Sequence, residues 1–228
     1  MDSFYAPSKI VDITIQNGVK KIKKRKRTQL LLGFLAGMFI AFAAYSGTMA
    51  MHSVESAGPA RVLGGAIFIV VLCFLSGLWD TSGGLLGAYT IKTALTKATL
   101  SPVSALASGI LCNILVCGSI LVMTMSTDMT GKIRGIFFTI MAFVVCGFEH
   151  SIANMYYLLA GLFAKLNPEY IEMAKTAYGL TNEQLNSLNI WTCLESTFYV
   201  SVGNMIGGMV FVSAIFFIIF RKLEKPDH

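Results

Sequence analysis

The residues best suited to chemistry in this sequence are Glu149, His150 and Ser151, because they interrupt a long apolar stretch. Apolar residues precede them from Gly135 to Phe148 and resume after them from Ile152 to Phe163. The first half would be ~21 Å long as a helix, whereas the hydrocarbon core of a bilayer is ~30 Å thick. Neither half spans alone, so the pattern predicts one helix broken near the membrane midplane.

A break at this depth predicts a binding site. A charged group at the bilayer centre costs at least ~2.5–3.5 kcal/mol, so such residues usually face a cavity or pathway. The second half-helix would offer its N–H groups and dipole to an anion, with Ser151 as the expected cap. His150 is the side chain whose charge changes near neutral pH. Together these features predict a site for a small anion or its conjugate acid. One alternative is a polar turn between two short helices, with Glu149 and His150 at the water interface. Another is a structural role for His150, hydrogen-bonded within the bundle.

The composition places the chain in a membrane. It is 55% hydrophobic and 13% charged, against roughly 25% charged in soluble domains, which argues against a cytosolic enzyme and a disordered chain. Residues 1–28 hold eight basic and two acidic residues and so carry the whole net charge of +6. This basic run directly precedes an apolar segment, which favours a cytoplasmic flank (residues 1–29) over the alternative of a nucleic-acid patch. We therefore expect a lipid bilayer as partner and no nucleic acid.

The apolar segments in the rest of the sequence predict an all-α integral membrane protein. A transmembrane channel domain is expected over residues 30–220 and a cytoplasmic tail over 221–228. The predicted domain carries five clear apolar segments: Leu30–Met51, Val62–Trp79, Pro102–Met125, the broken Ile133–Phe163 and Thr197–Phe220.

Two linkers join these segments. Asp80–Ser101 is amphipathic in its latter part, which predicts an interfacial helix or a partial crossing. Ala164–Glu195 predicts a surface excursion with a short helix around Pro168–Thr176. The five cysteines form no CxxC pair and no cysteine–histidine cluster, so no metal or cofactor is expected.

The charges conflict with an odd number of spans. Lys132–Arg134 and the tail Arg221–Lys225 are basic and should be cytoplasmic, like the amino terminus. Five spans would put both on the opposite side. The sequence therefore predicts either a partial crossing within Asp80–Ser101 or a shortened form of a six-span ancestor.

Several motifs resemble the formate/nitrite transporter family of formate, nitrite and hydrosulfide channels. The most specific is the run Gly147–Met155, which reads GFEHSIANM. The others follow in the family's order: GFLAGMFIA at 33–41, the stretch 78–97, GILCNILVC at 109–117 and GNMIGG at 203–208.

The resemblance implies a homopentamer with an aquaporin-like fold and one pore in each protomer. It implies that His150 interacts with the permeating monovalent anion and shares or transfers a proton, and that Phe143 forms an aromatic constriction. It implies that Lys97 draws anions to the vestibule, and that Asn113 and Asn154 are polar positions near the histidine. Glu149 belongs with this pore set. Gly203, Asn204 and Gly207 are expected at helix contacts, since GxxxG is a close-packing spacing.

The chain departs from the family in its second and third spans. The loop that breaks the family's second span is missing, and Val62–Trp79 resembles the start of that span joined to the end of the third. We expect a channel for formate, nitrite or hydrosulfide, or their weak acids, in the inner (plasma) membrane with its amino terminus cytoplasmic. The alternative is a non-conducting scaffold of the same family. A membrane enzyme using Glu149 and His150 as general base is disfavoured, since no nucleophile or metal cluster accompanies them.

Overall fold

The structure, a computed structural model, describes residues 4–24, 28 and 67–223 of the chain. Within these ranges it is helical, and the one β-type pairing is an isolated antiparallel bridge between Phe4 and Ser126. The predicted segment Leu30–Met51 lies outside the described residues. The helices are α1 (Pro7–Ile22), α3 (Ile67–Leu75), a 3₁₀ turn (Leu78–Asp80), α4 (Leu85–Ala98), α5 (Pro102–Met125), α6 (Met129–Cys146), α7 (Ser151–Ala164), α8 (Pro168–Tyr178), α9 (Asn182–Ser187), α10 (Ile190–Met205) and α11 (Ile215–Phe217).

Three helices in the described ranges are long and apolar enough to cross a membrane. They are α5, α6 and the continuous rod Ile190–Phe220, in which π-helical turns join α10 to α11. The expected start of this rod at Thr197 was wrong. Asn189 accepts hydrogen bonds from the N–H groups of Trp191 and Thr192 and so caps the helix well before Thr197.

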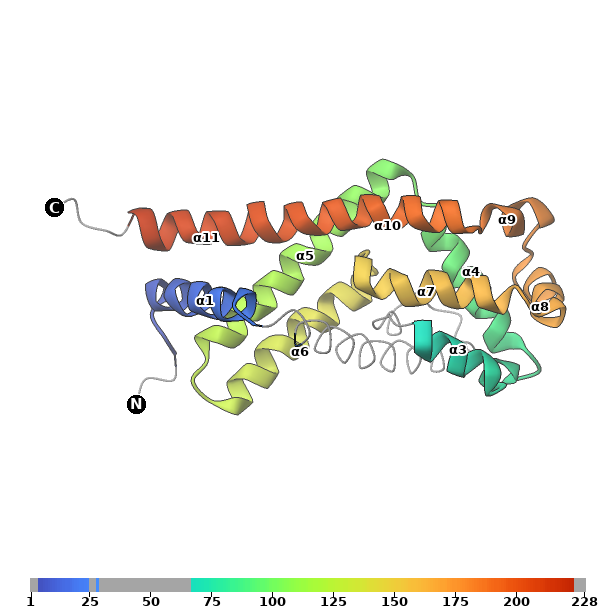
Figure 1. Ribbon diagram of the computed structural model, residues 1–228, viewed down its shortest axis with the longest axis horizontal. Helices are drawn as coiled ribbons and strands as arrows, with labels where there is room; N and C mark the ends of the chain where they lie inside the picture. Colours follow the sequence, from blue (N-terminus) through green and yellow to red (C-terminus); the bar gives the residue numbers. More distant parts are fainter. Residues whose placement is uncertain (1–3, 25–27, 29–66, 224–228) are drawn as a thin grey trace.

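Figure 1 shows how these helices are arranged. The rod of α10 and α11 runs the length of the molecule, and α5 crosses it obliquely. α6 and α7 meet end to end beside the rod, while α8 and α9 lie at one end of the molecule and α1 at the other. α5 packs on both α10 and α6, and α4 packs on α7 and α8. The bundle therefore holds the junction of α6 and α7 in its interior.

The expected span Val62–Trp79 differs from what the structure shows. Residues 62–66 lie outside the described ranges, and α3 ends at Leu75. Gly77 then adopts φ 68°, in the left-handed region that favours glycine, and begins a turn. Trp79, fully buried, follows in the short 3₁₀ turn. The chain reverses here, so the described part of this segment is no straight span.

The linker Asp80–Ser101 contains α4, which packs within the bundle. Most of α4 is buried, including Leu86, Ile91 and Leu95. α4 and α7 approach each other closely. A Cβ added at Gly161 of α7 would lie only 2.1 Å from the Cβ of Ala94 of α4. Sequence periodicity showed two lysines on this helix but could not show that α7 and α8 cover its other faces.

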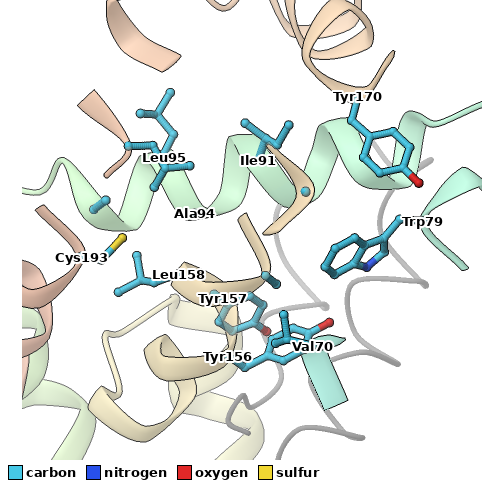
Figure 2. Packing of buried hydrophobic residues seen from close by; sticks show 14 of the residues in the cluster. Val70, Trp79, Ile91, Ala94, Leu95, Tyr156, Tyr157, Leu158, Tyr170 and Cys193 are labelled. Atoms are coloured by element: carbon cyan, nitrogen blue, oxygen red, sulfur yellow. The ribbon is translucent and has the colours of Figure 1, made fainter. Parts of the chain in front are cut away.

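One apolar cluster joins these elements, and Figure 2 shows part of it. Trp79 and Val70 face Tyr156 and Tyr157 of α7, with Tyr170 of α8 above. Burial of large aromatic side chains is the main stabilising contribution available to such a cluster. The cluster packs α7 against α3, α4 and α8.

The excursion after α7 contains the expected short helix. α8 covers the predicted Pro168–Thr176, and Asn167 caps it while Pro168 occupies its first turn. α9 follows, with a capping box between Thr181 and Gln184. Tyr170 anchors the excursion, since its ring lies over Gly87 and its hydroxyl donates a hydrogen bond to Asp80.

The amino-terminal basic segment is partly structured. α1 contacts α5 and the carboxyl-terminal end of the rod. Ile10 and Val11 of α1 are buried. The N–H of Tyr5 donates to the carbonyl of Met125 at 2.9 Å. The flank is therefore tied to the bundle before the dense basic run that starts at Lys20.

Candidate functional site

The predicted break is confirmed, with wider limits than 135–163. α6 begins at Met129, where Asp128 caps it by accepting from the N–H of Gly131 at 2.8 Å. The expected loop Lys132–Arg134 is therefore the first turns of α6. α6 ends at Cys146 because Gly147 adopts φ 68° and the chain turns away. α7 begins at Ser151, so the connection between the two helices is only Gly147–His150.

His150 is the capping residue of α7, a position the sequence had suggested for Ser151. Its Nδ1 accepts a hydrogen bond from the N–H of Ala153 at 3.4 Å. In a neutral imidazole the other nitrogen, Nε2, then carries the proton. The ring lies 6.0 Å from that of Phe143, centroid to centroid, at an interplanar angle of 34°. An apolar ring from α6 and a titratable ring from α7 therefore face each other at the break.

Glu149 and Lys97 form an ion pair beside the histidine. Lys97 Nζ lies 3.0 Å from Oε1 and 2.9 Å from Oε2 of Glu149. The two residues are each 7% exposed. The Nδ2 of Asn154 donates to the same carboxylate at 2.7 Å. Two opposite charges in a buried pair cancel at a distance, and each provides the partner that the other needs out of water.

Aromatic and hydroxyl groups complete the surroundings of the pair. Lys97 Nζ lies 5.2 Å from the ring centroid of Tyr157, which is a cation–π distance. The N–H of Glu149 donates to Ser108 Oγ at 2.9 Å. Ser196 Oγ donates to the carbonyl of Lys97 at 2.8 Å. α4, α5, α7 and α10 thus all contribute to holding one ion pair next to the break.

Asn204 of α10 binds both ends of the break. Its Oδ1 accepts from the N–H and the hydroxyl of Ser151, each at 3.0 Å. Its Nδ2 donates to the carbonyl of Gly109 at 2.9 Å and to that of Glu149 at 3.0 Å. Two of these partners, the N–H of Ser151 and the carbonyl of Glu149, are backbone groups that the broken helix leaves without helical partners. Asn204 therefore acts as a positioning residue, a larger role than the helix contact expected for it.

Glycines allow α10 to approach this closely. A Cβ added at Gly203 would lie 2.3 Å from the carbonyl oxygen of Leu106, and one at Gly207 would lie 2.3 Å from that of Ile110. Contacts this short leave no room for a side chain. The backbones of α5 and α10 consequently meet where Asn204 must reach across to the break.

The structure brings five of the six predicted pore residues together and sets one apart. Phe143, Glu149, His150, Asn154 and Lys97 meet at the junction of α6 and α7. Asn113 does not join this cluster through a described bond. It donates to the backbone carbonyl of Asn204 at 2.5 Å, which is a hydrogen bond between helices.

Sequence reasoning missed Ser108 and the reach of Asn204. A serine within an apolar helix carries no distinctive signal. Asn204, by contrast, is an amide among glycines in an otherwise apolar run, and a buried amide in a membrane helix needs partners on another helix. Among the described residues, no three acidic, cysteine or histidine side chains cluster in a way that could hold a metal ion.

Fold and site together define a class, a helical integral membrane protein with a channel fold built around a broken helix. The chain belongs to the formate/nitrite transporter family, whose sequence profile, "Formate/nitrite transporter", matches residues 60–218.

Individual relatives agree with this assignment. The uncharacterized transporter YrhG of Bacillus subtilis (strain 168) is 28% identical over 277 aligned positions, which cover 98% of this chain and 96% of the relative. The formate channel FocA of Escherichia coli (strain K12) is 31% identical over 167 residues, 72% of this chain and 56% of the channel. A solved pentameric formate channel with formate bound superposes with a TM-score of 0.59 at 27% identity, covering 68% of this chain and 60% of that one. These relatives are channels and transporters, not enzymes.

The chain is shorter than these relatives within its matched region. It spans only about half of the E. coli formate channel, 56% of its length. The alignment with the Bacillus transporter is 277 positions long, although this chain has 228 residues, and it includes nearly all of both. Part of the relative therefore has no counterpart here, and the location of the loss in the second and third spans stays a prediction.

Proposed function

We propose that this chain conducts small monovalent anions, or their weak acids, across the cell's inner (plasma) membrane, with formate, nitrite or hydrosulfide as substrate. The observation that carries the proposal is the position of His150 at the break between two half-helices, facing Phe143. Family membership and the formate channels among the relatives support the substrate class.

The proposed mechanism involves four residues at the break. Lys97 supplies positive charge near the path, but Glu149 binds it through both oxygens. Because the pair as a whole is neutral, Lys97 does not hold an anion permanently at the break. His150 then shares a proton with it through Nε2. The nearly neutral species passes the apolar ring of Phe143, which disfavours hydrated ions.

Assembly and orientation form part of the proposal. The solved relative is pentameric, so we propose a homopentamer with one pore per protomer. Because basic residues favour the cytoplasmic side, residues 1–29 and the tail 221–228 would be cytoplasmic. α1 and the carboxyl-terminal end of the rod lie together in the fold, so one side of the membrane holds both. Residues 30–220 form the channel domain.

A non-conducting scaffold is the second candidate, favoured by one observation. Part of the Bacillus relative that aligns over the whole chain is missing here. In a channel of this family the missing segment would face His150 across the pore. Without it the described fold could retain its packing and lose its path.

Flux into proteoliposomes tests the proposal. We expect the purified protein to carry formate, nitrite or hydrosulfide down a gradient, and His150→Asn to abolish most of this flux. His228→Asn, the same exchange at the last residue, is the matched control and should leave flux unchanged. If none of the three anions moves while the protein elutes as a folded oligomer, the channel proposal is wrong and the scaffold is favoured. If flux persists in His150→Asn, the proposed role of the histidine is wrong and the channel proposal still stands.

A further inference from the structure

The apolar face of α1 continues beyond the part that the described helices cover. Ile10 and Val11 are buried, and at 100° per residue Val11 lies on the same face as Ile15 and Ile22. Further along the helix, Ile15 and Val19 are 45% and 43% exposed, and Ile22 is 80% exposed. These three follow at helical spacing, so they form one stripe along the helix. The second half of α1 is therefore amphipathic in its own right.

Lysines border this stripe. Lys20 and Lys23 are exposed, and at 100° per residue Lys23 follows directly beside Val19 and Ile22 on the helix surface. In sequence the basic run continues to Arg27, and an apolar segment of membrane length begins at Leu30. A basic run in that position lies at the boundary between headgroups and hydrocarbon.

An apolar hollow opens beside the stripe. It lies between α1 and the spanning rod, with a volume of about 390 Å³. Ile15 lines both the stripe and the hollow, so the two are continuous. The other walls come from α5 and from the carboxyl-terminal part of the rod, through Leu121, Met209, Ser213 and Phe217.

We propose that α1 and this hollow form a binding site for an anionic phospholipid of the leaflet on the α1 side. Lys20 and Lys23 contact the headgroup phosphate, and the stripe and the hollow receive an acyl chain. Charge complementarity supports the headgroup contact, and continuity of the stripe with a hollow beside a spanning helix supports the acyl contact. This site is distinct from the break at His150, so it does not depend on the proposed transport.

A nucleic acid is the obvious rival for a lysine-rich helix. It would use the lysines but leave Ile15, Val19 and Ile22 in water. A lipid covers both kinds of side chain, and the observations therefore favour it.

Native mass spectrometry of the full-length protein in detergent tests the site. Phosphatidylglycerol and phosphatidylcholine with the same acyl chains are titrated separately, and the bound lipids are counted. We expect the wild-type protein to prefer phosphatidylglycerol. K20Q with K23Q should weaken phosphatidylglycerol binding roughly tenfold or more, at about 1 kcal/mol for each lysine, and leave phosphatidylcholine nearly unchanged. I15S should weaken the binding of both lipids.

The matched control removes two lysines at the other end of the molecule, Lys92 and Lys175. K92Q with K175Q should leave the lipid preference intact. Circular dichroism of each variant shows whether the helices remain folded. Equal binding of the two lipids by the wild type would overturn the proposal, as would a preference unchanged in K20Q with K23Q. Displacement of phosphatidylglycerol by a short DNA duplex that K20Q with K23Q no longer binds would also overturn it, in favour of nucleic acid.

Discussion

Replacing Asn204 by leucine removes four hydrogen bonds with little change in side-chain size. Two of the partners, the N–H of Ser151 and the carbonyl of Glu149, lie in the break and have no described helical partner. The carbonyl of Gly109, by contrast, belongs to the interior of α5. The break therefore bears most of the expected cost.

The magnitude follows from these unsatisfied groups. Leaving a buried backbone donor or acceptor without a partner costs about 1–3 kcal/mol. Two such groups at the break predict a loss of about 2–6 kcal/mol in the free energy of unfolding. Hydrogen bonds between membrane helices contribute on average only about 0.6 kcal/mol to stability. We therefore expect the measured loss to fall in the lower half of this range.

The assay is unfolding of the purified protein in mixed micelles of increasing SDS content, followed by circular dichroism. Hydrogen exchange at Ser151 provides a local readout, and we expect faster exchange at its amide in Asn204→Leu. Asn113→Leu is the matched control. It makes the same exchange at the same helix interface, but it removes one hydrogen bond to a helix carbonyl in place of four.

The comparison between the two variants can refute the reasoning. If Asn204→Leu costs no more than Asn113→Leu, Asn204 does not hold the break. If Asn204→Leu is destabilised but hydrogen exchange at the Ser151 amide is unchanged, the lost free energy of unfolding comes from elsewhere in the bundle.

Three further outcomes can be checked with the same unfolding assay. Gly203→Ala should lose about 1–3 kcal/mol by overpacking, whereas Gly118→Ala, where a Cβ would meet nothing within 4 Å, should be neutral or slightly stabilising; equal effects would contradict the close contact. Lys97→Met should cost about 3–5 kcal/mol by stranding a buried carboxylate, and adding Glu149→Gln should recover part of the loss; strictly additive effects would argue against the pair. Burial and a neighbouring carboxylate raise the pKa of Tyr170 to about 12. Its stabilising effect should therefore be complete below its ordinary pKa of about 10 and fade as pH rises to about 12. Tyr170→Phe should then lose less stability than the wild type between pH 9 and 12, and an identical loss would count against the bond.

Much of the fold was predictable because local sequence signals its helices. Asn189, Asn167 and Asp128 are capping residues at the starts of α10, α8 and α6. Apolar runs of membrane length identified α5 and the rod. The errors occurred where a capping residue, and not the apolar run, sets the start of a helix. The rod begins well before its apolar run, and α6 includes two basic residues that had been placed in a loop.

The site was predictable in part for the same reason. An ionisable pair within an apolar stretch is a local signal, and it correctly located the break. The bonds between distant segments left no such signal. Lys97 is far from Glu149 in the sequence, and only the packing of α4 against α7 makes them an ion pair. Burial of α4 likewise depends on α7 and α8, which no periodicity within α4 reveals.

The sequence by itself determined that the chain is a helical membrane protein with a helix broken near Glu149 and His150, because hydropathy and charge act within a few residues. Its motifs were also sufficient to indicate the family. Only the tertiary structure decided which nitrogen of His150 caps α7, which carboxylate binds Lys97 and which amide holds the break. These depend on the close approach of α5 and α10 at Gly203 and Gly207, where the absence of a side chain lets Asn204 reach backbone groups that the broken helix cannot satisfy itself.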